Sequence, residues 1–172
     1  SGILLNTASL DYQYVKINFE NYLLVIGNTN KKRTLADSKY NERRAECEEG
    51  LKYLKEKFSI KFLCDLTMKE FNDNQELIGN DTVLKRVRHV ISENERTLNA
   101  YQALLNNDLK SFGNLLNESH RSLKEDYEVT GHELDSMQEL FVEYGAIGAR
   151  MTGAGFGGCV IALVEESKAE WV

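Results

Sequence analysis

The sequence has no proline, only three cysteines and no long apolar run. Cys47, Cys64 and Cys159 are odd in number and widely spaced, and none forms a C-x-x-C pair, which argues against a disulfide framework or a zinc site. We therefore expect free, structural thiols and a reduced, cytoplasmic setting. The longest apolar run, at residues 160–164, is far shorter than the roughly 18 residues of a membrane-spanning helix, so we expect no membrane partner.

Positive charge is also scarce. The 172 residues include 21 Lys and Arg against 27 Asp and Glu, which gives a formal net charge of −6. Because binding to nucleic acid requires a basic surface, we expect no nucleic-acid partner. Hydrophobic residues make up 42% of the chain, enough for one sizeable core, and this composition excludes disordered, collagen-like and low-complexity chains.

Apolar and β-branched runs at both ends of the chain predict strands. These runs are residues 3–5, 12–19, 22–26, 146–152 and 159–164. Glu20 and Asn21 predict a tight turn that would pair the second run with the third as a hairpin. Strands followed by several helices and then by strands again indicate an α+β domain rather than alternating βαβ units.

Five stretches in the middle of the chain have the period of amphipathic helices. The first has start signals at Thr34 and continues past residue 50, and the second begins at Thr67, where Thr67-x-x-Glu70 has the form of a capping box. The third covers residues 81–106, Asp108 caps the fourth, and the fifth covers residues 133–144. Gly145 then stands where a C-terminal glycine cap is expected.

The glycine-rich segment GAGFGG at residues 153–158 is the most informative feature of the sequence. Its spacing fits G-x-G-x-x-G, but a buried strand follows where a dinucleotide-binding fingerprint requires a helix. A Walker loop is excluded as well, because its Gly-Lys-Ser/Thr ending is absent. Two interpretations remain open: a loop whose backbone N–H groups approach a ligand, and a tight hairpin turn that needs positive φ angles.

Other candidate residues have competing interpretations. The basic residues Lys31–Arg33 either face a phosphorylated ligand or form an ordinary solvated surface. Tyr40 either stacks on and hydrogen-bonds a sugar or is the first core residue of its helix. His89, His120 and His132 have no carboxylates at metal-ligand spacing, so we expect them to be structural or exposed.

Three segments of the chain resemble the galactokinases, a family within the GHMP small-molecule kinases. RMTGAGFGGC at residues 150–159 resembles the third motif of that family. NTN at residues 28–30 with LADSKYNERRAECE at 35–48, and SHRSLKEDYEV at 119–129 with ELD at 133–135, extend the likeness. The resemblance runs from about Leu4 to the last residue.

The resemblance implies a ferredoxin-like core of short strands with a layer of about five helices. It also implies transfer of the γ-phosphoryl group of ATP, with Mg²⁺, to the anomeric hydroxyl of galactose. Tyr40 matches the family tyrosine that contacts galactose, and Gly153, Ala154 and Gly155 match the loop that faces the sugar and the phosphoryl group. The family often has glycine where this sequence has Ala154, and alanine is a small change from glycine.

The resemblance covers only the C-terminal portion of the family. The motifs Gly-Glu-His, Gly-Leu-Ser-Ser and Met-Asp-Gln, which supply the catalytic Arg, the ATP cradle and the catalytic Asp, are absent from residues 1–172. We therefore expect no catalytic or metal-binding residue here, no activity without the N-terminal domain, and an apolar face that favours self-association. The alternatives are a galactokinase-like sugar sensor that regulates transcription, a free-standing interaction module, and a kinase for another sugar such as N-acetylgalactosamine.

Overall fold

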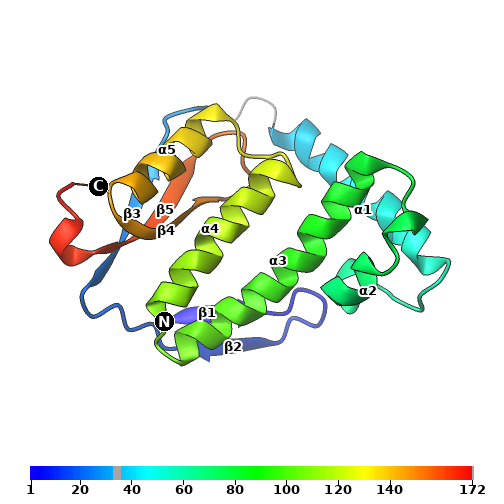
Figure 1. The fold of residues 1–172 in the computed structure, drawn as a ribbon, viewed down its shortest axis with the longest axis horizontal. Coiled ribbons are helices and arrows are strands. Elements are labelled where there is room, and N and C mark those ends of the chain that lie inside the picture. Colours follow the sequence, from blue (N-terminus) through cyan, green and yellow to red (C-terminus); the bar gives the residue numbers. More distant parts are fainter. Residues whose placement is uncertain (33–35, 172) are drawn as a thin grey trace.

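The chain folds into a layer of helices and a layer of strands (Figure 1). The structure is a computed structural model that describes residues 1–32 and 36–171. The described helices are α1 (Ala36–Lys55), α2 (Met68–Asn72), α3 (Asp81–Leu105), α4 (Leu109–Glu125) and α5 (His132–Glu143). The described strands are β1 (Gly2–Leu5), β2 (Tyr12–Val15), β3 (Tyr22–Asn28), β4 (Ala146–Thr152) and β5 (Cys159–Glu165). This order confirms the predicted α+β class.

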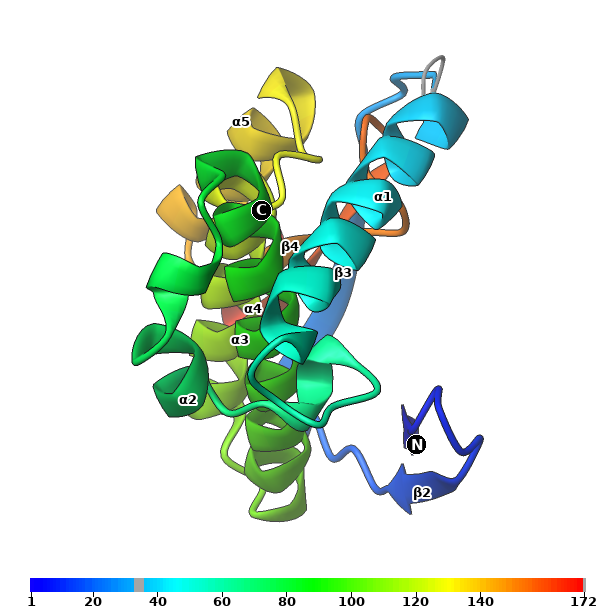
Figure 2. The same cartoon turned by 90° about the vertical axis from the view of Figure 1, so that its right-hand side faces the viewer.

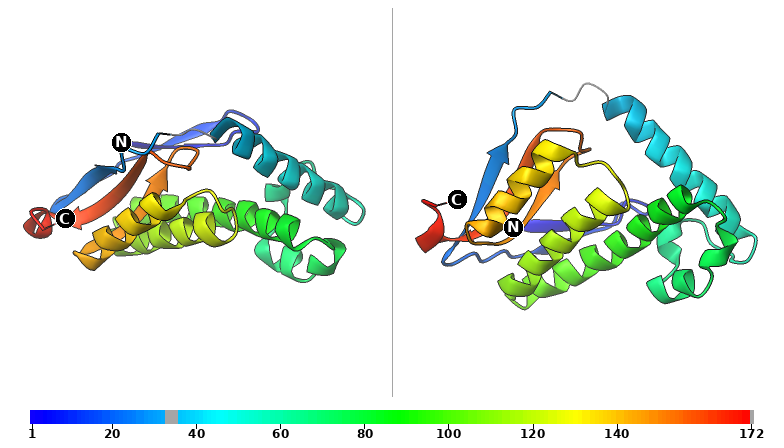
Figure 3. Two further views of the ribbon diagram at one scale, coloured as in Figure 1. Left: turned by 90° about the horizontal axis from the view of Figure 1, so that it is seen from above. Right: turned by 45° about the horizontal axis from the view of Figure 1, so that its top comes forward.

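The strands form two antiparallel sheets. β1 pairs with β2, and the second sheet has the order β3–β5–β4. In the central strand β5, Val160 lies opposite both Gly27 of β3 and Met151 of β4. Figure 3 shows α3, α4 and α5 together on one side of this second sheet. The sheet therefore holds β4 and β5, and the glycine-rich loop between them, against a helical layer.

The predicted hairpin between residues 12–19 and 22–26 is wrong. The N–H of Tyr22 does donate to the carbonyl of Phe19 at 2.5 Å, so the chain turns at the predicted place. The turn leads from one sheet to the other, however, because β2 pairs with β1 and β3 pairs with β5. Turn residues set a local change of direction, whereas strand pairing depends on which apolar faces are buried together.

The predicted helix boundaries have the expected caps. The hydroxyl of Thr67 accepts from the N–H of Glu70 at 3.2 Å, and the Glu70 carboxylate accepts from the N–H of Thr67 at 2.9 Å. This reciprocal capping box begins α2. The Asp108 carboxylate accepts from the N–H of Ser111 at 3.0 Å and begins α4. Gly145, with a φ of 108°, follows the end of α5 as the expected glycine cap.

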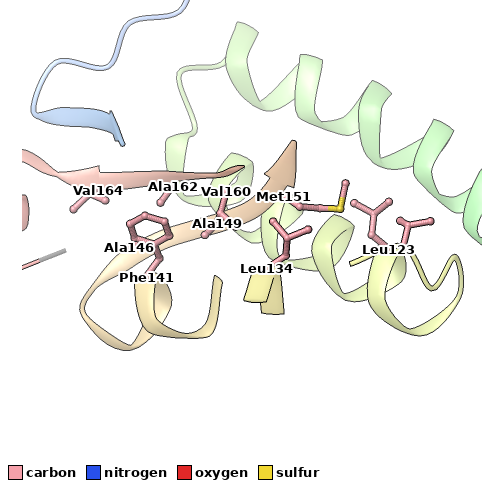
Figure 4. Packing of buried hydrophobic residues seen from close by; sticks show 10 residues of the cluster. Leu123, Leu134, Phe141, Ala146, Ala149, Met151, Val160, Ala162 and Val164 are labelled. Atoms are coloured by element: carbon pink, nitrogen blue, oxygen red, sulfur yellow. The ribbon is translucent and has the colours of Figure 1, made fainter. Parts of the chain in front are cut away.

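One hydrophobic core lies between the main sheet and helices α4 and α5 (Figure 4). Met151 of β4 and Val160 of β5 are fully buried, and Leu134 and Phe141 of α5 pack in the same cluster. The side chain of Leu123 extends this core from α4. Because both strands are held by this core up to the residues beside the glycine-rich loop, the two ends of that loop are fixed in space.

A second core joins α1, α2 and α3. Leu54, Phe71 and Val87, one from each helix, have no exposed surface. The predicted start signal of α1 at Thr34 lies outside the described residues, and α1 begins at Ala36. This core fixes the direction of α1, the helix that carries Tyr40.

The β1–β2 hairpin stands to one side of the helices (Figure 2) and exposes large apolar side chains. Ile3, Leu5, Leu10, Tyr12 and Tyr14 are each at least 50% exposed. Such a surface is typical of an interaction site, so the expected self-association stays a prediction with a physical basis. None of the helices in the described part of the chain is both long and apolar enough to cross a membrane.

Candidate functional site

The glycine-rich loop at residues 153–158 closes the hairpin between β4 and β5. Gly153, Gly155, Gly157 and Gly158 all have φ angles between 83° and 129°. An L-residue with a side chain rarely adopts this region, so the turn interpretation of these glycines is confirmed. Phe156 also has a positive φ, of 58°, although it is not a glycine.

The loop packs against the backbone of residues 128–130 on one side. The N–H of Phe156 donates to the carbonyl of Val129 at 2.8 Å. A Cβ atom added to Gly155 would lie only 2.1 Å from that same carbonyl oxygen. Gly155 is therefore needed for close contact with the protein's own chain, and its expected role in facing the sugar and the phosphoryl group stays a prediction.

Residues 29–31 pack against the other side of the loop. Both the N–H and the hydroxyl of Thr29 donate to the carbonyl of Gly158, at 2.9 and 2.7 Å. A Cβ atom on Gly157 would lie 2.7 Å from the carbonyl oxygen of Lys31. Gly153 and Ala154 are exposed, so they are the part of the loop that is open to a ligand.

Two buried arginines hold the segment that supports the loop. Nε of Arg43, from α1, donates to the carbonyl of Tyr127 at 2.7 Å, and Nη1 of Arg86, from α3, donates to the carbonyl of Asp126 at 2.5 Å. Arg86 also pairs with the carboxylates of Glu46 and Glu128 at 2.7 and 2.6 Å. Its hydrogen bond lowers the pKa of Glu128. Two arginines, Arg43 and Arg86, and the carboxylates of Glu46 and Glu128 thus anchor residues 126–128 to helices α1 and α3.

Tyr40 lies near the start of α1 and is 55% exposed, so it is not a core residue of that helix. The pKa of the half-buried Tyr127 is raised mainly by burial, with smaller contributions from Cys47 and Tyr40. Tyr127 is two residues from Val129, the residue that holds Phe156. Figures 1 and 3 show the start of α1 and the tip of the β4–β5 hairpin at the same end of the molecule. The contact of Tyr40 with a sugar stays a prediction.

The basic segment before α1 is partly neutralised. Nζ of Lys31 pairs with the carboxylate of Glu133, in the first turn of α5, at 2.6 Å, and this bond lowers the pKa of Glu133. Lys32 is exposed, and Arg33 lies outside the described residues. Lys31 therefore links residues 29–31 to α5 and helps hold that side of the loop.

A cavity of about 340 Å³ lies next to Gly153. Its walls include Arg96 and Glu93 of α3 and Arg150 and Thr152 of β4. Nη1 of Arg150 lies 3.5 Å from Glu93, and burial lowers the pKa of Arg150. Two cations and one carboxylate thus give this wall a positive balance beside the exposed end of the loop.

Two of the three histidines are buried in the helical layer. The ring of His89 stacks on Tyr127 with 4.4 Å between ring centres, and its Nδ1 lies 2.9 Å from the hydroxyl of Ser122. Burial lowers the pKa of His89 to about 4. The ring of His120 is bonded to Asp135 and to the backbone of β4. His132 is exposed, so the structural and exposed roles expected for the histidines both occur.

The described residues include no group of three or more His, Cys, Asp or Glu side chains that could hold a metal ion. The three cysteines are free. The site can therefore position a ligand through exposed main chain at Gly153 and Ala154, and through the phenol of Tyr40, but the described groups do not fit a resident metal.

Comparison with known proteins identifies the class. Residues 100–171 match the family described as "GHMP kinases C terminal". The chain also shares the fold of a mevalonate kinase from L. major solved with R-mevalonate, with a TM-score of 0.59 and 21% identity over 94% of this chain and 39% of that one. Together with the galactokinase matches that follow, these findings show that residues 100–171 form a GHMP kinase C-terminal domain and that the chain is similar to the C-terminal portion of galactokinases.

Within that class the chain is most informatively compared with galactokinases. It is 55% identical to the galactokinase of Clostridium acetobutylicum and 58% identical to that of Enterococcus faecalis, over 96% and 95% of this chain. The galactokinase of Lactococcus lactis, solved in complex with galactose, superposes with a TM-score of 0.94 and 49% identity over 98% of this chain. The chain spans less than half of these relatives, 42–44% of their length.

Sequence reasoning missed the supports of the loop. The contact of Gly155 with Val129 joins segments about 26 residues apart, and the contact of Gly157 with Lys31 joins segments about 126 residues apart. Neither contact has a local signature. The only available signal was the density of glycine itself, which indicated a close approach without showing which chain approaches.

Proposed function

We propose that this chain forms one wall of the active site of a galactokinase, which transfers the γ-phosphoryl group of ATP to the anomeric hydroxyl of galactose in the cytoplasm. The observation that carries the proposal is the TM-score of 0.94 to a galactokinase that was solved with galactose. Identities of 55% and 58% to further galactokinases support it. The rest of the protein, including the N-terminal domain, supplies the other wall.

In this proposal the chain positions the sugar. The exposed main chain of Gly153 and Ala154 lies against the hexose and the phosphoryl group, and the hydroxyl of Tyr40 hydrogen-bonds the sugar. Phosphoryl transfer depends mainly on positioning and on charge stabilisation, so a rigid loop is a direct contribution to rate. The packing of Gly155 against Val129 and of Gly157 against Lys31 supplies that rigidity.

ATP and Mg²⁺ are proposed for the intact protein only. The described residues include no cluster of three or more His, Cys, Asp or Glu side chains that could hold a metal ion, which supports the proposal that Mg²⁺ and the ATP phosphates are held by residues outside this chain. The catalytic Arg and Asp are likewise proposed to lie outside it. The chain alone is therefore expected to be inactive.

The experiment compares the full-length protein with the isolated chain in ATP, Mg²⁺ and galactose, and measures galactose 1-phosphate. We expect turnover of roughly 1–100 per second for the full-length protein and none for the chain. Comparable turnover by the chain would contradict the proposal. Galactose binding without turnover by the full-length protein would favour a sugar sensor, and turnover only with N-acetylgalactosamine would favour another sugar kinase.

Tyr40→Ala in the full-length protein tests the sugar contact. Loss of a hydrogen bond and of ring contact, together about 1–3 kcal/mol, should raise the galactose KM roughly tenfold or more with a smaller effect on kcat. Tyr40→Phe retains the ring and should give an intermediate KM. An unchanged KM in Tyr40→Ala would refute the contact.

A further inference from the structure

The outer edge of β4 is satisfied by side chains instead of by a fourth strand. Nδ2 of Asn117 donates to the carbonyl of Ile147 at 3.3 Å, and its Oδ1 accepts from the N–H of Ala149 at 2.9 Å. Nε2 of Gln138 donates to the carbonyl of Ala149 at 3.3 Å. Ile147 and Ala149 are alternate residues of β4, and their backbone groups are those that a neighbouring strand would otherwise hydrogen-bond.

His120 completes this row of bonds at the end of the strand. The N–H of Met151 donates to its Nδ1 at 3.1 Å, and its Nε2 lies 3.2 Å from Oδ1 of Asp135. Asn117 and His120 are three residues apart on α4, and Asp135 and Gln138 are three residues apart on α5, so each pair shares a helix face. Two helices thus present three side chains, Asn117, His120 and Gln138, to one strand edge, and Asp135 bonds to His120.

The bonding pattern fixes the tautomer of His120. Because Nδ1 accepts a hydrogen bond from the N–H of Met151, it carries no proton itself, and the proton of the neutral ring is on Nε2, which donates to Asp135. The ring is 3% exposed, and burial lowers its pKa, although Asp135 opposes that effect. The other charges acting on the ring are those of Lys124, which lies 3.7 Å from Asp135, and Arg150.

Met151 is the second-last residue of β4, and the exposed end of the glycine-rich loop begins two residues later, at Gly153. A bond to its N–H therefore holds the strand at the point where Thr152 and Gly153 leave the sheet. We propose that His120 is a positioning residue of the glycine-rich loop, acting through the backbone of Met151, with Asp135 holding the ring in the required tautomer. The consequence for catalysis rests on the proposed function; the positioning itself does not.

The test uses three variants of the full-length protein. His120→Leu removes both bonds, whereas His120→Gln retains an acceptor for Met151 and a donor for Asp135. His132→Leu is the matched control, because it makes the same substitution at an exposed position. For each variant we would measure amide hydrogen exchange at Met151 and in residues 152–155. We would also measure kcat and KM for galactose.

We expect His120→Leu to speed exchange at Met151 roughly tenfold, the equivalent of about 1.4 kcal/mol, with exchange in α3 unchanged. Its kcat should fall by a similar factor, while His120→Gln restores most of both values and His132→Leu changes neither. Unchanged exchange at Met151 in His120→Leu would overturn the proposal. So would faster exchange throughout the chain that His120→Gln does not correct.

A second measurement needs no variant. The ring nitrogen resonances of His120 in the wild-type protein should show Nδ1 unprotonated and Nε2 protonated at neutral pH, and a protonated Nδ1 would overturn the proposal. If the wild-type protein does not phosphorylate galactose, the proposed function fails, but the exchange and resonance measurements still decide the role of His120.

Discussion

Replacing Gly155 by alanine separates two reasons for a glycine in this loop. Its φ of 85° strains any residue with a side chain, and the added Cβ would lie 2.1 Å from the carbonyl oxygen of Val129. Positive φ costs about 1–2 kcal/mol, and relieving a backbone overlap of this size costs about 1–3 kcal/mol more. We therefore expect Gly155→Ala to lower the free energy of unfolding by about 4 kcal/mol.

Three other glycines supply matched controls. Gly131 has a φ of 90° with nothing within 4 Å of an added Cβ, so Gly131→Ala tests strain alone. Gly148 is outside the positive-φ region, but its Cβ would lie 1.9 Å from the carbonyl oxygen of Gly113, so Gly148→Ala tests overlap alone. Gly79→Ala meets neither obstacle and should be close to neutral.

Urea denaturation followed by circular dichroism measures all four variants. The expected order of destabilisation places Gly155→Ala first, Gly131→Ala and Gly148→Ala between, and Gly79→Ala last. If Gly155→Ala costs no more than Gly131→Ala, the contact with Val129 does not constrain the loop. The explanation of the loop's rigidity would then be wrong.

Three further predictions concern the helical layer. Arg86→Met removes the buried cation that pairs with both Glu46 and Glu128, leaving them only Arg43 and Lys85, and should cost about 3 kcal/mol in urea denaturation. A loss as small as that of the exposed Arg44→Met would contradict the anchoring role. The pKa of His89 is lowered from 6.5 to about 4, so the unfolded state binds a proton first as pH falls, and stability should decrease by about 3 kcal/mol between pH 7 and 4. His89→Gln should lose this part of the pH dependence, and an unchanged slope would refute it. Asp108→Ala should lower the midpoint of thermal denaturation, whereas Asp108→Asn, which retains a cap, should lower it much less, and equal losses would show that the cap is unimportant.

The helices could be predicted because their signals are local. Helix ends are marked by hydrogen bonds or backbone angles within a few residues. In the structure, Thr67 with Glu70 begins α2, Asp108 begins α4, and Gly145 follows the end of α5, as predicted. The apolar period of the third helix likewise placed its end within one residue of Leu105. Such features depend on backbone groups that must be satisfied nearby.

Strand pairing could not be predicted in the same way. The turn at Glu20 and Asn21 is present, but β3 pairs with β5, whose residues lie more than 130 positions further along the chain. The free energy that selects this partner comes from burying Val160 and Ala162 against α5 rather than from the turn. The sequence pattern around the turn therefore does not indicate which strand β3 pairs with.

The candidate site was predicted in part. The density of glycine indicated a tight turn, which the φ angles confirm, and the exposure of Tyr40 excludes the core interpretation. The use of Gly155 to approach Val129, and the bonding of His120 to β4, depend on contacts between distant segments. The ligand contacts of Tyr40, Gly153 and Ala154 stay predictions.

The most direct test of these contacts is the set of nuclear Overhauser effects between bound galactose and the full-length protein. We expect contacts from the sugar protons to the ring of Tyr40 and to the methyl group of Ala154. Bound galactose that shows contacts only to other residues, with none to either of these two, would contradict the assignment of this surface as the sugar-facing wall.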